Sequence, residues 1–297
     1  MERLVTYLEK RKRLSIALVF AYFTGILLLH DCFVKISVFI MYALTRTLYD
    51  RIVGSITLFF LAVFLFFFIK NLRTIRQAVD LKFTYLLAIT GLIIIHTQMN
   101  FVMNIEIIHT LQFGLLALLI YPLTRSFGAT LYYTVLLGAM DELYQYQVLY
   151  PEKNDYFDFN DLLLDQLGAA LALLFMFSTG VSSKSKESSS GWHKSPVFIS
   201  GMTIAIALAV MFRMSLITAY FTKGANPLMT LSESTGPESF WRHLANSDIV
   251  FHVITPLEGA LSLVIICGLF FLLDFLAAKE IEVSENFSMK SSPVFQG

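Results

Sequence analysis

The chain has 297 residues, of which 56% are hydrophobic and only 15% are charged, and its mean hydropathy is +0.67. A globular core cannot bury that much apolar surface, so lipid must cover the remainder. Lys plus Arg equals Asp plus Glu at 22 each, and this zero net charge gives no electrostatic basis for binding nucleic acid. Cys32 and Cys267 stand in neither a CxxC nor a metal-type spacing and are interpreted as packed thiols.

The first part of the chain contains two apolar runs bordered by basic residues. Residues 1–13 are basic and precede the apolar run 14–30; no small-residue cleavage site follows, so this run is predicted to be an uncleaved first span. Residues 31–53 alternate apolar stretches with charges and are predicted to form an interfacial or re-entrant segment. The second predicted span, 54–69, ends in a basic loop at 70–82, which is typical of the cytoplasmic side.

The middle of the chain is too long and too apolar for one helix. Residues 83–123 would measure roughly 60 Å as a single helix, about twice the thickness of a bilayer core. The chain must therefore turn back near its polar Gln and Asn residues, which predicts spans at 83–98 and 105–123. Two further apolar runs predict spans at 128–147 and 161–179.

The C-terminal part begins with a Ser-rich polar linker at 181–196. Two more spans are predicted, at 197–221 and 250–277, on either side of an outer loop at 222–249. The sequence thus predicts an all-α fold, a polytopic transmembrane bundle of about eight spans. We divide it into an N-terminal two-span unit (1–82), a central unit (83–180), the linker, and a C-terminal two-span unit with a tail (197–297).

The distribution of Lys and Arg predicts the sidedness of the protein in a cell membrane. A basic N-terminus inside and eight crossings put both termini and the linker 181–196 in the cytoplasm. Residues 147–160 and 222–249 then lie outside.

Ionisable residues within these spans are costly, by about 2.5 to 3.5 kcal/mol each on insertion scales, and therefore need partners or a water-filled cavity. They fall in three groups at the predicted outer ends of the spans: Glu106 and His109; Asp141, Glu142 and Gln145; and Asp158, Asp161 and Asp165. Spacings of three and four residues place members of each group on one helix face. We expect the three faces to line one outward-facing acidic cleft. Because so many carboxylates cannot all ionise side by side, either some are protonated or a cation binds among them.

Three short motifs in this region occur in a fixed order: EIIH from Glu106 (ExxH), DELYQ from Asp141 (DExxQ), and FDFNDLLLDQLG from Phe157 (FDxxDxxxDxxG). Their order, spacing and position at helix ends resemble the VanZ-like membrane protein family, named for a teicoplanin-resistance protein, over roughly residues 83–180. The resemblance implies a role in the cell envelope, such as a function like glycopeptide resistance, and no defined reaction. It implies that the characteristic positions are Glu106, His109, Asp141, Glu142, Gln145, Asp158, Asp161 and Gly168.

This chain departs from the family pattern at two positions. Asp165 stands where the family has Asn, and Asp155 stands where a basic residue precedes the FD pair. Both changes make the site more acidic, which disfavours an anionic ligand.

Simpler interpretations stand beside the functional one. Asp161 alone fits a helix N-cap better than a catalytic group, and Glu106 with His109 fits a structural pair equally well. A divalent cation is an open alternative, with Glu106, His109, Asp141 and Asp161 as candidate ligands. A di-iron bundle would need a second ExxH, and EIIH is not the HExxH of zinc proteases.

The leading hypothesis is a VanZ-like multi-pass protein whose cleft recognises a lipid or envelope precursor near the outer leaflet. A first alternative is a membrane-embedded enzyme acting on a lipid-linked envelope substrate, with Glu106 or Glu142 as base, His109 as acid or ligand, and Asp141 and Asp161 as orienting groups or metal ligands. A transporter and a purely structural membrane protein are further alternatives.

Two charges near the C-terminal spans are expected to pair. Arg213 lies within the seventh predicted span and needs a counter-ion. Counted from the outer ends of their spans, Arg213 and Glu258 reach nearly the same depth, so the sequence predicts an ion pair between them.

Overall fold

The computed structural model describes residues 1–74, 79–99, 107–150, 157–181, 183, 195–220, 227–232, 241–243 and 250–291. Of the described residues, 84% are helical, in agreement with the predicted all-α class. In the described part of the chain, five helices are long and apolar enough to cross a membrane. These are α2, α5, α7, α8 and the first part of α9.

The helices in chain order are α1 (Glu2–Lys10), α2 (Lys12–Leu44), α3 (Arg46–Thr74), α4 (Val79–Met99), α5 (Ile107–Thr124), α6 (Phe127–Tyr144), the π-helical turn η2 (Gln145–Leu149), α7 (Phe159–Ser178), α8 (Pro196–Arg213) and α9 (Pro256–Ser291). Two pairs of very short strands complete the fold: parallel β1 (Ile217–Thr218) with β2 (Met229–Thr230), and antiparallel β3 (Trp241–His243) with β4 (Val250–His252).

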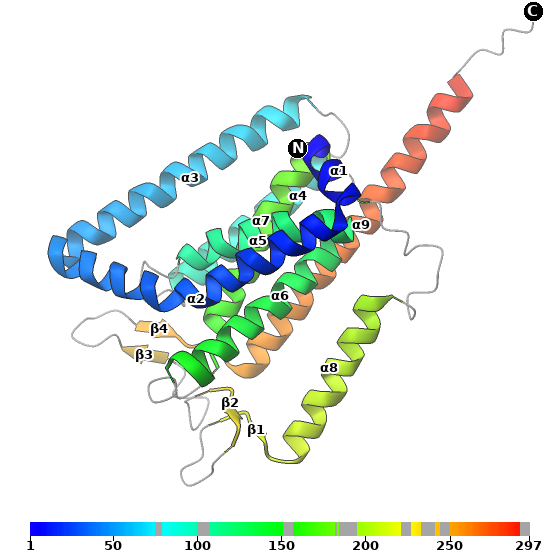
Figure 1. Cartoon of the computed structure of the whole chain (residues 1–297). Helices are drawn as coiled ribbons and strands as arrows, with labels where there is room; N and C mark the ends of the chain where they lie inside the picture. Colours follow the sequence, from blue (N-terminus) through cyan, green and yellow to red (C-terminus); the bar gives the residue numbers. More distant parts are fainter. Residues whose placement is uncertain are drawn as a thin grey trace, which may run out of the picture.

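Helix α7 occupies the centre of the bundle and is surrounded by α4, α5, α6 and α9 (Figure 1). Its closest neighbour is α5, because two glycines remove the side chains that would separate the two backbones. A Cβ atom at Gly168 would overlap the backbone of Thr110, 2.6 Å from its Cα, and one at Gly114 would lie 3.1 Å from the carbonyl oxygen of Gly168. Small residues that allow such close approach are typical of helix pairs in membranes. This contact fixes the depth of α5 relative to α7.

The segment 31–53, predicted to be interfacial, is not a separate element. Residues 31–44 continue helix α2, and residues 46–53 begin helix α3, with the chain reversing at Thr45, where φ is 72°. Helix α2 packs against α5 through Phe23 and Phe113, and the hydroxyl of Tyr22 donates to the carbonyl of Gln112 over 3.2 Å.

Different contacts hold the helices together at the two ends of the bundle. At one end, which we call the α1 end, Arg125 forms ion pairs with Glu2 and Glu9, and Asp274 of α9 accepts from the amides of Phe127 and Gly128 at the start of α6. At the opposite end, which we call the strand end, the short strands join the loop before α7. There the amide of Phe157 donates to Thr230 over 2.9 Å, and Gln147 donates to Leu228 over 3.0 Å.

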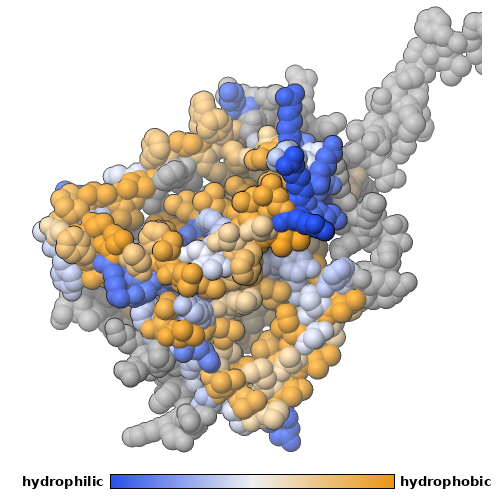
Figure 2. All heavy atoms as spheres, in the orientation of Figure 1, coloured by the Kyte–Doolittle hydropathy of each residue, from blue (hydrophilic) through white to orange (hydrophobic). Residues whose placement is uncertain are grey.

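Helix α8 presents apolar side chains to the outside along its whole length. None of its residues is buried, and Ile199, Ile206 and Val210 are all more than half exposed. Figure 2 shows hydrophobic residues spread over α8 and α2, while the largest group of hydrophilic residues on this face lies at α1. Exposed apolar surface of this extent needs a covering, which a lipid bilayer provides.

The predicted pair between Arg213 and Glu258 is not formed. Arg213 is exposed at the end of α8, whereas Glu258 accepts from the amide of Thr255 over 2.8 Å and lies 2.9 Å from Nε2 of His252. The physical reason is local. The sequence TPLE from Thr255 is a capping box with proline at the first helical position, so Glu258 belongs to the N-terminus of α9. Helix α9 corresponds to the eighth predicted span, 250–277. It begins at Pro256, after β4, and not at residue 250.

Candidate functional site

The described members of the three predicted groups meet at the strand end of the bundle. His109 lies in the first turn of α5, Asp141 and Glu142 in the last turn of α6, and Asp165 in the second turn of α7. Each of these four residues is at least 95% buried. We call His109, Asp141, Glu142, Gln145 and Asp165 the acidic centre. Glu106, which was predicted to belong to it, lies outside the described residues.

The contact between His109 and Asp165 joins α5 to α7 in the middle of the acidic centre. Nδ1 of His109 is 3.1 Å from Oδ1 of Asp165, and neither side chain is open to solvent. The close approach of Gly168 to Thr110, one turn further along, positions the two side chains opposite each other. Asp165, seen in the sequence mainly as a departure from the family pattern, is therefore the direct partner of the motif histidine.

Gln145 holds the two carboxylates of α6. Its Nε2 donates to Oδ2 of Asp141 over 3.2 Å and to Oε1 of Glu142 over 3.1 Å. Gln145 begins the π-helical turn, in which the amide of Tyr150 donates to the carbonyl of Gln145 over 2.9 Å. Such turns often accompany functional sites.

Asp158 and Asp161 lie at the start of α7, and one of them caps the helix. Asp158 is the N-cap of α7, since its Oδ1 accepts from the amide of Asn160 over 2.8 Å, and Asp161 lies in the first turn. The expectation that Asp161 caps the helix was therefore wrong. Burial raises the pKa of Asp158 to about 7, and the neighbouring Asp161 acts in the same direction.

Asp161 lies in the first turn of α7 and is only partly buried. Because it precedes Asp165 by four residues, it lies on the same face of α7 as that residue.

His30 is a component of the site that the sequence analysis did not find. It is buried in α2, its ring centroid lies 5.8 Å from that of His109, and Tyr150 approaches it at 6.4 Å. The hydroxyl of Tyr150 donates to Asp31, the next residue along α2. The signal was present, because His30 and Asp31 are adjacent ionisable residues inside a long apolar run.

Three side chains of the acidic centre could hold a metal ion. One ligand atom each from His109, Asp141 and Glu142 lie within 4.8 Å of one another. Of the predicted metal candidates, the structure thus brings His109 and Asp141 together and adds Glu142. Asp161 is not in this group.

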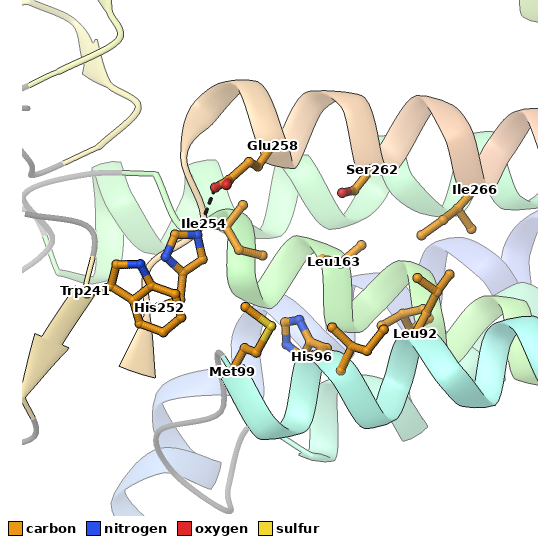
Figure 3. A pocket seen from close by; sticks show the side chains of 12 residues that line it. Leu92, His96, Met99, Leu163, Trp241, His252, Ile254, Glu258, Ser262 and Ile266 are labelled. Atoms are coloured by element: carbon orange, nitrogen blue, oxygen red, sulfur yellow. Dashed lines mark hydrogen bonds and ion pairs between the residues drawn. The ribbon is translucent and has the colours of Figure 1, made fainter. Parts of the chain in front are cut away.

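A second feature lies on the opposite face of α7, between α4, α7 and α9. This groove has a volume of about 320 Å³, and Figure 3 shows Trp241, His252 and Glu258 at one end of it and Leu92 and Ile266 at the other. The Trp241 and His252 rings lie 4.8 Å apart. The groove is therefore polar towards the strands and apolar along the helices.

Comparison of the chain with protein-family models, with curated proteins and with solved structures found no match. The acidic centre is thus the basis for assigning a function.

Proposed function

We propose that this chain is a VanZ-like integral membrane protein of the cell envelope, with about eight spans and both termini in the cytoplasm. Its acidic centre, at the outer side of the membrane, recognises the polar head of an amphiphilic envelope component. The five helices that can span a bilayer support a multi-pass protein. Helices α3, α4 and α6 correspond to the other three predicted spans.

The observation that carries this proposal is the convergence of the acidic centre. Residues 109, 141, 142 and 165 come from three helices, yet they are buried together at one end of the bundle. Burying several carboxylates costs free energy unless they have a task or a compensating partner, so such groups inside a membrane protein mark a functional site by default. A structural pair would need only one histidine and one carboxylate.

The groove supports an amphiphile as the ligand. It offers apolar side chains such as Leu163 and Leu167 for a hydrocarbon chain, and His252 with Glu258 for polar atoms. The groove and the acidic centre thus lie on opposite faces of α7, and His96 adds a further polar side chain to the groove.

A membrane-embedded enzyme acting on a lipid-linked substrate is favoured as a second candidate by the His109–Asp165 contact. A carboxylate that holds one imidazole nitrogen leaves the other to exchange a proton with a substrate, which is the arrangement of many acid–base catalysts. A carrier has less support. Among the described residues, the buried side chains that follow the acidic centre towards the α1 end are mostly apolar, for example Phe113, Leu116 and Leu173.

The experiment that tests this function compares a deletion strain with its parent. Envelope lipids and peptidoglycan precursors are quantified by mass spectrometry, and glycopeptide susceptibility is measured beside them. We expect at least one envelope lipid or precursor to accumulate or disappear in the deletion strain and to return on complementation with the full chain. Identical profiles and identical susceptibility in the two strains contradict the proposal.

A further inference from the structure

We propose that His109, Asp141 and Glu142 bind one divalent transition-metal ion, and that Asp165 orients the imidazole of His109 for this purpose. The inference rests on the proposed function, because both treat the acidic centre as a functional site. It adds a metal ion as the ligand of that centre. It stands on geometry and on the hydrogen bonding of the buried carboxylates.

The spacing of the donor atoms fits a metal ion after a small adjustment. Nitrogen and oxygen ligands lie about 2.0 to 2.2 Å from an ion such as zinc, so two ligands in a tetrahedral site are roughly 3.4 Å apart. The three donor atoms here lie within 4.8 Å of one another. Metal binding therefore requires the side chains of Asp141 and Glu142, neighbours in the last turn of α6, to rotate towards His109 in the first turn of α5.

The hydrogen bonding of Asp141 leaves an acceptor to be satisfied. Its side chain is fully buried, and Oδ2 accepts from Gln145, while Oδ1 has no hydrogen-bond partner in the part of the chain that the structure describes. A buried acceptor without a partner costs free energy, and more so when it is charged. A cation bonded to Oδ1 removes this cost.

The surroundings of the three donors are those of a metal site. Because Asp165 engages Nδ1 of His109, Nε2 is the nitrogen left for an ion, and carboxylates commonly orient metal-bound histidines in this way. Gln145 restrains both carboxylates by hydrogen bonds. Two ionised carboxylates with one dication are also electrically neutral, which lowers the cost of burying them.

The donor set indicates the class of ion. One imidazole nitrogen with carboxylate oxygens suits Zn²⁺, Mn²⁺ or Fe²⁺, whereas Mg²⁺ and Ca²⁺ favour sites made of oxygen alone. The ion would bind at the strand end, on the face of α7 opposite the groove.

The test is metal binding by the purified full-length protein in detergent. Metal content is measured by elemental mass spectrometry after exposure to Zn²⁺, Mn²⁺ or anaerobic Fe²⁺ and removal of unbound ion. The wild-type chain should retain about one ion, which should also raise its unfolding temperature. Asp141→Asn and Glu142→Gln should each lower the affinity at least tenfold, and Asp165→Asn should lower it by 10- to 100-fold through His109.

The control is Glu2→Gln, which changes a carboxylate paired with Arg125 at the α1 end, away from both the acidic centre and the groove. It should bind metal as the wild type does. A wild-type protein that retains none of the three ions overturns the inference, even if a variant fails to fold. Equal affinities for Asp141→Asn and Glu2→Gln also overturn it. The proposed function is tested by a different experiment, the envelope profile of the deletion strain, so failure of one proposal can be distinguished from failure of the other.

Discussion

His109 and Asp165 are 56 residues apart in the chain, yet Nδ1 of the first lies 3.1 Å from Oδ1 of the second inside the bundle. Removing one partner leaves the other buried without it, which typically costs about 3 to 5 kcal/mol for a charged pair. We therefore expect Asp165→Leu to lower the unfolding temperature strongly. A joint His109→Phe and Asp165→Leu change should recover part of the loss, since Phe can stack on Phe113 as His109 does. Thermal unfolding in detergent measures this, and strictly additive effects of the two changes would contradict the contact.

The close approach of α5 and α7 predicts a large effect at Gly168. A Cβ atom there overlaps the Thr110 backbone, which cannot move as a flexible side chain could, so Gly168→Ala should cost about 1 to 3 kcal/mol or more. Gly91→Ala in α4 is the control, because a Cβ at Gly91 meets nothing within 4 Å. Alanine there should be neutral or slightly stabilising. The yield of monodisperse protein and its unfolding temperature are compared, and similar values for the two variants would show that the helices are not this close.

The groove predicts that an amphiphile co-purifies with the protein. Ser262→Phe places a ring in the groove and should lower the occupancy of bound lipid in native mass spectrometry severalfold. Leu261→Phe adds a ring at the adjacent, exposed position outside the groove and should leave the occupancy unchanged. Equal occupancy in both variants would mean that the ligand binds elsewhere.

The proposed topology predicts which residues an impermeant thiol reagent reaches in intact cells. In a background with Cys32 and Cys267 replaced by Ser, Leu228→Cys at the strand end should react, and Glu187→Cys in the linker should react only after the cells are opened. The reverse labelling pattern would show that the protein has the opposite orientation in the membrane, with the acidic centre on the cytoplasmic side.

Much of the architecture could be predicted from the sequence because membrane helices are encoded locally. Long apolar runs and the charges that border them indicated the long helices α2 to α9, though not α1, and spacings of three and four residues indicated the faces that meet at His109 and Asp141. Helix ends were less well predicted. The residues after Arg213 form a strand instead of continuing the span, and α9 begins at the capping box that includes Glu258.

The parts that were missed depend on which helices are neighbours. The pattern along α2 shows that His30 is unusual but not that α2 packs beside α5, which brings it to His109. Likewise, the predicted pair of Arg213 and Glu258 rested only on their similar depth in the membrane. In the structure, the carboxylate of Glu258 contacts His252 and the N-terminus of α9 instead. Contacts between distant segments depend on which helices pack together. Gly168 permits a close helix contact, but the sequence does not show that its partner is α5.

We propose that the acidic centre recognises the envelope component, and complementation of the deletion strain tests this most directly. The deletion strain is complemented with the wild-type chain, with Glu142→Gln, or with Gly91→Ala, and the amount of each protein in the membrane is matched before envelope lipids and precursors are quantified. Glu142→Gln replaces a buried carboxyl group by an amide of the same size, and Gly91→Ala leaves the centre intact. We predict that Glu142→Gln reproduces the profile of the deletion strain and that Gly91→Ala restores the parental one. A parental profile with Glu142→Gln would contradict the account.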